Sequence, residues 1–446
     1  MPAPSAQAGE RTLVRALGVR ALAATTFNVM IGSGIFVLPA IAAGMMGAAA
    51  PVAYVACALA MGLIVLCFAE AGSRVSLTGG PYAYVGVALG PFVGFLSGVL
   101  LWLLTLFATA AVASALAGAA AVFWAPLGAG VPRTLFLAAV FALLAWINVR
   151  GVRQGTRVVE VVTVAKLLPL ILLVAVGFFV APAASTPVVV EPRVLGRTMV
   201  ILIFAFAGVE SALVPSGEVR DPARTVPRAL AIAMVVVTLL YVAIQLVAQR
   251  ALGVAALAAA HDAGLSEAAR RIAGPVGGTL LAAGAVVSML GHVSGMTLAT
   301  PRALYALGRD GFIPGASRAI AAVHPRWRTP WVAILVHVTI AATLAISSSF
   351  APLAILANVS VLVLYLLCCV AAFELRRRDV RAGGTPFRVP GGAAVPVAAA
   401  VVIVWILAHA TVREFAVVGA VLCVATLLYV ATAPARRRPL ASASES

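Results

Sequence analysis

The first long apolar segment of the chain, residues 21–47, carries two closely spaced glycines near its middle. It includes the stretch Asn28-Val-Met-Ile-Gly-Ser-Gly-Ile-Phe-Val-Leu-Pro-Ala40. The segment is long enough to cross a bilayer, for which ~20 apolar residues suffice. Glycine costs ~1 kcal/mol against alanine inside a helix, and backbone groups freed by a weakened helix cannot face lipid. We therefore expect a broken helix that lines a cavity, where the N–H groups starting its second half attract an anion such as a carboxylate.

The composition places this segment in a membrane protein. Hydrophobic residues make up 63% of the chain and charged residues 10%, whereas soluble domains carry about 25% charged residues. The net charge of +17 does not indicate nucleic acid binding, because the basic residues lie in short segments between apolar runs, as membrane topology requires. The five cysteines have no metal-ligand spacing and predict neither a disulfide framework nor a zinc site. No catalytic motif, metal site or cofactor motif is recognisable, so an enzyme is not expected.

Hydropathy predicts an all-α polytopic protein with about twelve transmembrane helices. Most arginines then fall on the side of the N-terminus, which predicts that both termini are cytoplasmic. We expect a tail over 1–20, a transporter domain over 21–433 and a second tail over 434–446. The expected spans are 21–47, 51–75, 82–119, 133–149, 157–182, 196–219, 228–250, 272–306, 331–349, 351–375, 394–411 and 412–433.

The sixth span repeats the pattern of the first. Gly208, Glu210 and Pro215 interrupt its apolar run, much as glycines and a proline interrupt the first span. Interrupted spans at corresponding places of two halves indicate a binding site at the bilayer midplane. We therefore predict two repeats, about 21–182 and 196–375, followed by extra helices over 394–433. A kinked packing helix is the alternative for the sixth span.

Ionisable residues inside a membrane are costly, so each is a candidate functional group. Glu70 has Arg74 one helical turn later, and an exposed ion pair at a helix end is the simpler interpretation. Lys166 lies about ten residues, roughly 15 Å, into the fifth span, which is deep for a lysine that reaches the interface. It could serve as a fixed cation or a proton carrier. His292 fits a hydrogen-bonded core imidazole, with a role in the site or in proton relay as the alternative.

Four stretches together resemble the amino acid-polyamine-organocation (APC) superfamily of permeases, in particular its bacterial amino acid transporters. They are Gly32 to Phe36, Phe68 to Tyr84, Gly208 to Pro222 and Tyr305 to Pro314. They occur in the family's order and at the same span positions. The resemblance implies the LeuT-like fold, a 5+5 inverted repeat with broken first and sixth helices.

The resemblance also implies how a substrate is held. Backbone N–H groups at the first break would bind its α-carboxylate, and backbone carbonyls at both breaks would bind its α-amino group. An aromatic gate would be Phe204, while Lys166 would occupy the place of a sodium ion in sodium-coupled relatives. The implied substrate-binding residues are Ile31, Ser33, Gly34, Ile35, Phe204, Ala205, Ala207 and Gly208, and Lys166 and Glu210 are the coupling or gating residues.

The sequence therefore predicts a secondary active transporter of the cytoplasmic membrane that works by alternating access. Its partners would be the lipid bilayer, an amino acid and protons, with no nucleic acid. Phe, Ala, Gly and Ser around the site favour a neutral substrate, although the carboxylate of Glu210 would also suit a cationic one. Proton symport is the leading mechanism. An exchanger of amino acids or polyamines is the alternative, and an amino acid sensor that does not transport is a more distant one.

Overall fold

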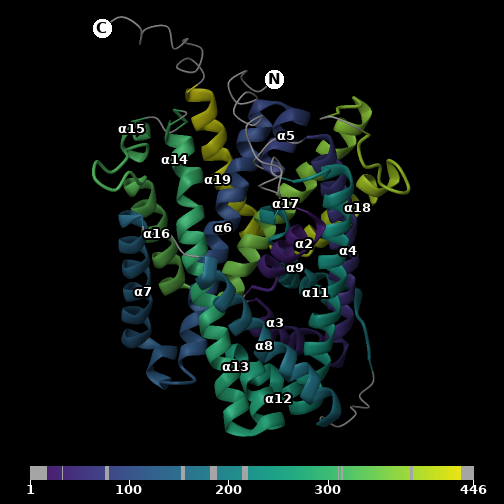
Figure 1. The fold of residues 1–446 in the computed structure, drawn as a ribbon, viewed down its shortest axis with the longest axis vertical. Coiled ribbons are helices and arrows are strands. Elements are labelled where there is room, and N and C mark those ends of the chain that lie inside the picture. The colour runs from purple at the N-terminus through teal and green to yellow at the C-terminus, as the bar shows by residue number, and fades with distance from the viewer. Residues whose placement is uncertain are drawn as a thin grey trace, which may run out of the picture.

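A computed structural model describes residues 18–32, 34–75, 80–151, 156–180, 188–212, 219–309, 311–312, 315–381 and 385–432. Its secondary structure elements are helices, and the long ones run along the longest axis of the molecule (Figure 1). We call the upper end in Figure 1 the terminal face, which carries α5 (Pro81–Leu89), α14 (Pro301–Arg309) and α15 (Ser317–Ile320). The other end, with α12 (Val254–Ala259), is the opposite face. Most of the expected tails, together with Ser33 and Pro215, lie outside the described residues.

Among the described residues, seven helical segments are long and apolar enough to cross a membrane. Three shorter apolar helices accompany them, at Ala165–Val180, Trp331–Ser347 and Ala394–Leu407. This confirms the prediction of an all-α protein with many spans. Besides α14, the helices in these segments are α3 (Gly34–Met46), η1 (Gly47–Ala49), α4 (Ala50–Arg74), α6 (Pro91–Ala120), α7 (Gly130–Arg150), α8 (Thr156–Val180), α11 (Pro222–Leu252), η4 (His261–Ala263), α13 (Gly264–Ala299), α16 (Trp331–Ser347), α17 (Phe350–Arg377), α18 (Ala394–Leu407) and α19 (Val412–Ala431).

Both expected helix breaks are present. The first separates α2 (Val19–Met30) from α3, because the N–H of Gly32 turns back to the carbonyl of Met30 at 2.8 Å and ends the helix. The second separates α9 (Pro192–Phe206) from the short α10 (Val209–Ala212). Because α2 packs against α10 and α3 packs against α9, the two breaks lie side by side.

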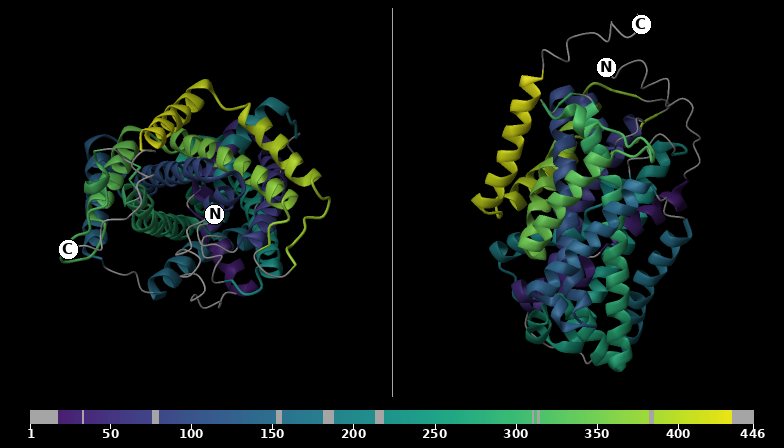
Figure 2. Two further views of the ribbon diagram at one scale, coloured as in Figure 1. Left: turned by 90° about the horizontal axis from the view of Figure 1, so that it is seen from above. Right: turned by 90° about the vertical axis from the view of Figure 1, so that its left-hand side faces the viewer.

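Two groups of helices flank the breaks. Helix α11 packs against α2 and α4, and α4 also packs against α9. On the other side α13 packs against α6 and α8. A β-carbon built on Gly284 would lie 2.8 Å from the carbonyl oxygen of Ala165, so glycine allows α13 and α8 to approach closely. Helices α18 and α19 lie along one edge of the bundle, as the view from above in Figure 2 shows.

Candidate solute-binding site

A pocket lies between the two helix breaks, and α6 and α13 line its other sides. Its walls are mostly apolar, with the carboxylate of Glu210, the imidazole of His292 and the hydroxyl of Thr105 as polar side chains. The lining residues are Val29, Met30, Gly32, Gly34, Leu104, Thr105, Ala108, Phe204, Ala207, Gly208, Glu210, His292 and Met296.

The start of α3 lies at the pocket. Helix α3 begins at Gly34, which lines the pocket, and Ile35 follows it in the core. The first N–H groups of a helix have no partner within the helix, and the helix dipole makes that end positive. The described part of the first break therefore brings the positive end of a helix to the pocket.

The end of α2 is held by Lys166. Its Nζ donates to the carbonyl oxygen of Asn28 at 2.6 Å, and the side chain is buried. That carbonyl would normally accept from the N–H of Gly32, which instead turns to Met30. Lys166 thus satisfies a carbonyl that the break leaves without its helical partner. The lysine is connected to the site through the backbone of α2.

Tyr241 of α11 joins the two broken helices. Its hydroxyl lies 2.8 Å from the carbonyl oxygen of Met30 and 3.0 Å from that of Ala205. A hydroxyl has one proton and donates to one acceptor at a time, while each carbonyl oxygen has two lone pairs. The carbonyl oxygen of Met30 also accepts from the N–H of Gly32 at 2.8 Å, so a bond from Tyr241 fills its second lone pair, and a substrate ammonium group would have to displace that bond.

Glu210 holds the second break in place. Its two carboxylate oxygens accept from the N–H of Gly208, each at 3.0 Å, and the hydroxyl of Tyr365 donates to it at 2.6 Å. Gly208 has a φ of 108°, and a β-carbon there would lie 2.8 Å from Cγ1 of Val29. Only glycine suits this position. Glu210 therefore connects the break to α17. Among the described residues, its hydrogen bonds go to Gly208 and Tyr365, and that of Lys166 goes to Asn28.

Phe204 covers the pocket toward the opposite face. Its ring packs edge to face against Phe350, the first residue of α17, with centroids 5.3 Å apart. It also lies over Gly34, where a β-carbon would come within 3.0 Å of Cδ1 of Phe204. The resemblance implies an aromatic gate at this position, and that role stays a prediction.

Comparison with known proteins assigns the family. The model of the amino acid permease family matches residues 17–433. The chain belongs to the amino acid permease family. This family consists of transporters, not enzymes, and the permease is a multi-pass membrane protein.

Several curated relatives match the permease over most of its length. A methylthioribose transporter of Bacillus subtilis (strain 168) is 29% identical over 90% of each chain. A serine/threonine exchanger of the same organism is 26% identical over 82% of this chain and 84% of its own. A branched-chain amino acid permease, also from that organism, is 28% identical over 88% of this chain and 87% of its own. The three relatives are named for different solutes, so their names do not identify the substrate of this permease.

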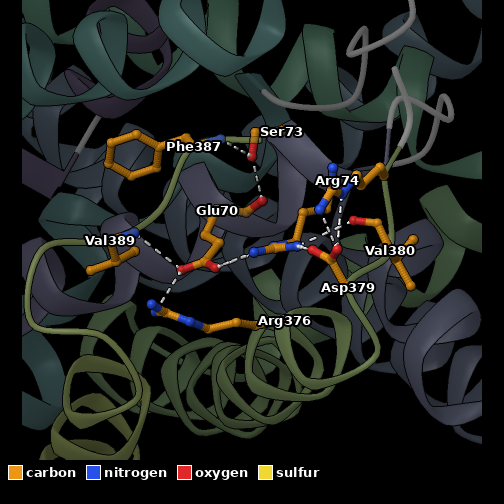
Figure 3. Close-up of polar contacts among 9 residues, drawn as sticks. Glu70, Ser73, Arg74, Arg376, Asp379, Val380, Phe387 and Val389 are labelled. Carbon is orange, nitrogen blue, oxygen red and sulfur yellow. Dashed lines mark hydrogen bonds and ion pairs between the residues drawn. The ribbon is translucent and has the colours of Figure 1, made fainter. Parts of the chain in front are cut away.

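A second polar cluster of the permease lies at the terminal face, where α4 ends (Figure 3). Arg74 donates to the carboxylate of Glu70 from Nε at 3.2 Å and from Nη2 at 2.9 Å, and both side chains are 1% exposed. The carboxylate also accepts from the N–H of Val389 at 3.2 Å, and Arg376 lies 3.4 Å from it. The sequence predicted this ion pair correctly but wrongly expected it to be exposed. The segment that connects α17 to α18 covers the pair.

The structure brings together only part of the predicted site. Of the predicted residues, Gly34, Phe204, Ala207, Gly208 and Glu210 line the pocket. Sequence reasoning missed Tyr241 and Tyr365, the tyrosines that fix the breaks, although a tyrosine inside an apolar span needs a hydroxyl partner and could have been a signal. Ser33 lies outside the described residues, while Ile31, Ile35, Ala205 and Lys166 are buried but are not among the described residues that line the pocket.

Proposed function

We propose that this permease carries neutral amino acids across the cytoplasmic membrane by alternating access, with the substrate bound between the two helix breaks. The observation that carries the proposal is that α3 begins, at Gly34, inside a pocket whose facing wall is the break at Gly208. The pocket thereby offers N–H donors for a carboxylate and, at Met30 and Ala207, carbonyl-bearing backbone for an ammonium group. The other walls are largely apolar, which suits an uncharged side chain.

The substrate's zwitterion would be bound at its two ends by the two breaks. Ser33, Gly34 and Ile35 would donate to the carboxylate. The carbonyls of Ile31 and Phe204 would supplement those engaged by Tyr241. Glu210 is already bonded to Gly208 and Tyr365, so we assign it to gating and not to the substrate ammonium group.

Proton coupling through Lys166 is the leading mechanism. A lysine ammonium beside the first break would repel a sodium ion at the same place. Its bond to the carbonyl of Asn28 connects the charge of Lys166 to the end of α2. Loss of its proton would weaken this bond, because hydrogen bonds from a charged donor are stronger, and would free the end of α2 to move.

Exchange is the second candidate, favoured by the similarity to a curated serine/threonine exchanger. In that mechanism an amino acid on one side would be traded for one on the other, and Lys166 would be a structural cation. No net ion movement would be needed.

Uptake into proteoliposomes tests the proposal. A panel of labelled amino acids is offered with and without an inward proton gradient, to wild type, Lys166→Met and Lys166→Arg. Under symport the gradient drives accumulation, Lys166→Met loses that dependence, and Lys166→Arg keeps the bond to α2 but binds its proton too tightly to cycle. Uptake that needs internal amino acid and ignores the gradient would identify an exchanger. Binding of amino acids without any uptake would support a sensor.

A further inference from the structure

The pocket has two walls of different chemistry. The wall formed by α2, α3, α9 and α10 contains the two helix breaks, whereas the wall formed by α6 and α13 lies within helices, where the backbone groups bond to one another. If the breaks hold the carboxylate and the ammonium group, the substrate side chain projects toward α6 and α13. That second wall consists of Leu104, Thr105, Ala108, His292 and Met296.

The two polar side chains of the second wall differ in their remaining capacity to hydrogen-bond a ligand. The hydroxyl of Thr105 lies 3.0 Å from the carbonyl oxygen of Leu101 and 2.9 Å from that of Trp102, so its proton is used within α6. His292 is different. Its Nε2 is buried and has no hydrogen-bond partner among the described residues.

The imidazole of His292 faces the first break. A β-carbon built on Gly32 would lie 3.8 Å from its Nδ1, so the ring packs beside the glycine that ends α2. A neutral imidazole has one N–H donor and one acceptor nitrogen. A buried polar group without a partner is unfavourable unless something else supplies the bond, and the pocket that His292 lines is where a ligand would do so. The core-imidazole interpretation from the sequence required a protein partner, and none is found in the described part of the chain.

We propose that His292 is a specificity-determining residue of this permease, and that its imidazole hydrogen-bonds a hydroxyl on the side chain of a small neutral amino acid. The inference deepens the proposed function and rests on it. A hydroxyl is the matching group because it both donates and accepts, and it carries no charge into a pocket with largely apolar walls. Serine and threonine are then preferred over alanine and valine, which have nearly the same shapes but lack the hydroxyl.

The threonine to valine ratio of uptake efficiency, measured in proteoliposomes, tests this directly. Wild type should favour threonine. His292→Leu should lower the ratio about tenfold, the effect expected for one lost hydrogen bond of a buried group, mainly by reducing threonine uptake. His292→Gln, which still has a donor and an acceptor, should recover part of the preference. The serine to alanine ratio should change in the same direction.

A matched control is available in α16. His337 is fully buried and both of its ring nitrogens lack hydrogen-bond partners among the described residues, but it is not among the described residues that line the pocket. His337→Leu removes the same chemical group from the membrane domain and should leave the ratio unchanged. If His292→Leu is not recovered as monodisperse protein, His292→Met is measured in its place, and the wild-type ratio is a test in itself.

The outcomes separate this inference from the proposed function. Amino acid uptake with no preference for threonine over valine in wild type would overturn the role of His292 and leave the transport proposal standing. An unchanged ratio in an active His292→Leu variant would do the same. Failure of wild type to take up or exchange any amino acid would overturn the proposed function itself.

Discussion

Replacing Glu70 with alanine should destabilise the permease strongly, because it removes the main partner of an arginine that is almost completely shielded from water. Arg74 is 1% exposed and directs both Nε and Nη2 at the carboxylate of Glu70. In a surface ion pair, water would take over this role. At this position the covering segment around Val389 excludes it, since Val389 is itself buried (Figure 3).

The size of this destabilisation depends on the hydrogen-bond and ion-pair partners that Arg74 keeps. Breaking a buried ion pair by removing one partner costs about 3–5 kcal/mol. Arg74 retains the carbonyl of Val380 at 3.2 Å and the carboxylate of Asp379 at 3.6 Å. We therefore expect a loss near the lower end of that range, about 3 kcal/mol in the free energy of unfolding. Glu70→Gln keeps one acceptor oxygen and should lose less.

Unfolding in mixed micelles titrated with a denaturing detergent, followed by tryptophan fluorescence, measures this free energy. Glu267→Ala is the matched control, because Glu267 lies 3.6 Å from Arg270 and both side chains are more than 40% exposed. Such a surface pair contributes about 0–1 kcal/mol. The double variant Glu70→Ala/Arg74→Ala should lose less than the sum of the single changes. A loss for Glu70→Ala no larger than that for Glu267→Ala would refute the reasoning.

Three further changes test other parts of the molecule. Gly208→Ala should cost about 1–3 kcal/mol of unfolding free energy, from its positive φ and its contact with Val29, and should reduce uptake; full uptake would show that the second break is not needed. Phe204→Ala should uncover the site toward the opposite face and lower the ratio of internal to external amino acid reached in proteoliposomes. An unchanged ratio would show that Phe204 is not a gate. The guanidinium of Arg381 holds the pKa of Asp379 below its usual range. The stabilisation from Asp379 is therefore present above pH ~3.9 and lost as the pH falls through the lowered pKa. Asp379→Asn should be less stable than wild type at pH 7, with the difference vanishing in acid, and a constant difference in unfolding titrations across that range would contradict this assignment.

The spans and both helix breaks could be predicted from the sequence because their causes are local. A run of apolar residues sets where a helix can cross lipid, and Gly32 and Gly208 weaken the helix in which they lie. The position of α17, from Phe350 to Arg377, follows the same rule. Such features depend only on residues close together in the chain.

The bonds that position the site could not be predicted, because their partners are far apart in sequence. Lys166 and Asn28 are separated by 138 positions, and Glu210 and Tyr365 by 155. The spacing of Glu70 and Arg74 predicts their pairing within one helix, whereas their burial depends on a segment more than 300 residues later. No local pattern contains that information.

A structure determined with a bound amino acid tests the central proposal most directly. We expect density for the ligand between the start of α3 and the break at Gly208, with its carboxylate within hydrogen-bond distance of the N–H groups of Gly34 and Ile35 and its side chain toward His292. Density for the ligand outside this pocket, or a carboxylate bound by Lys166 in place of the first break, would contradict the proposal.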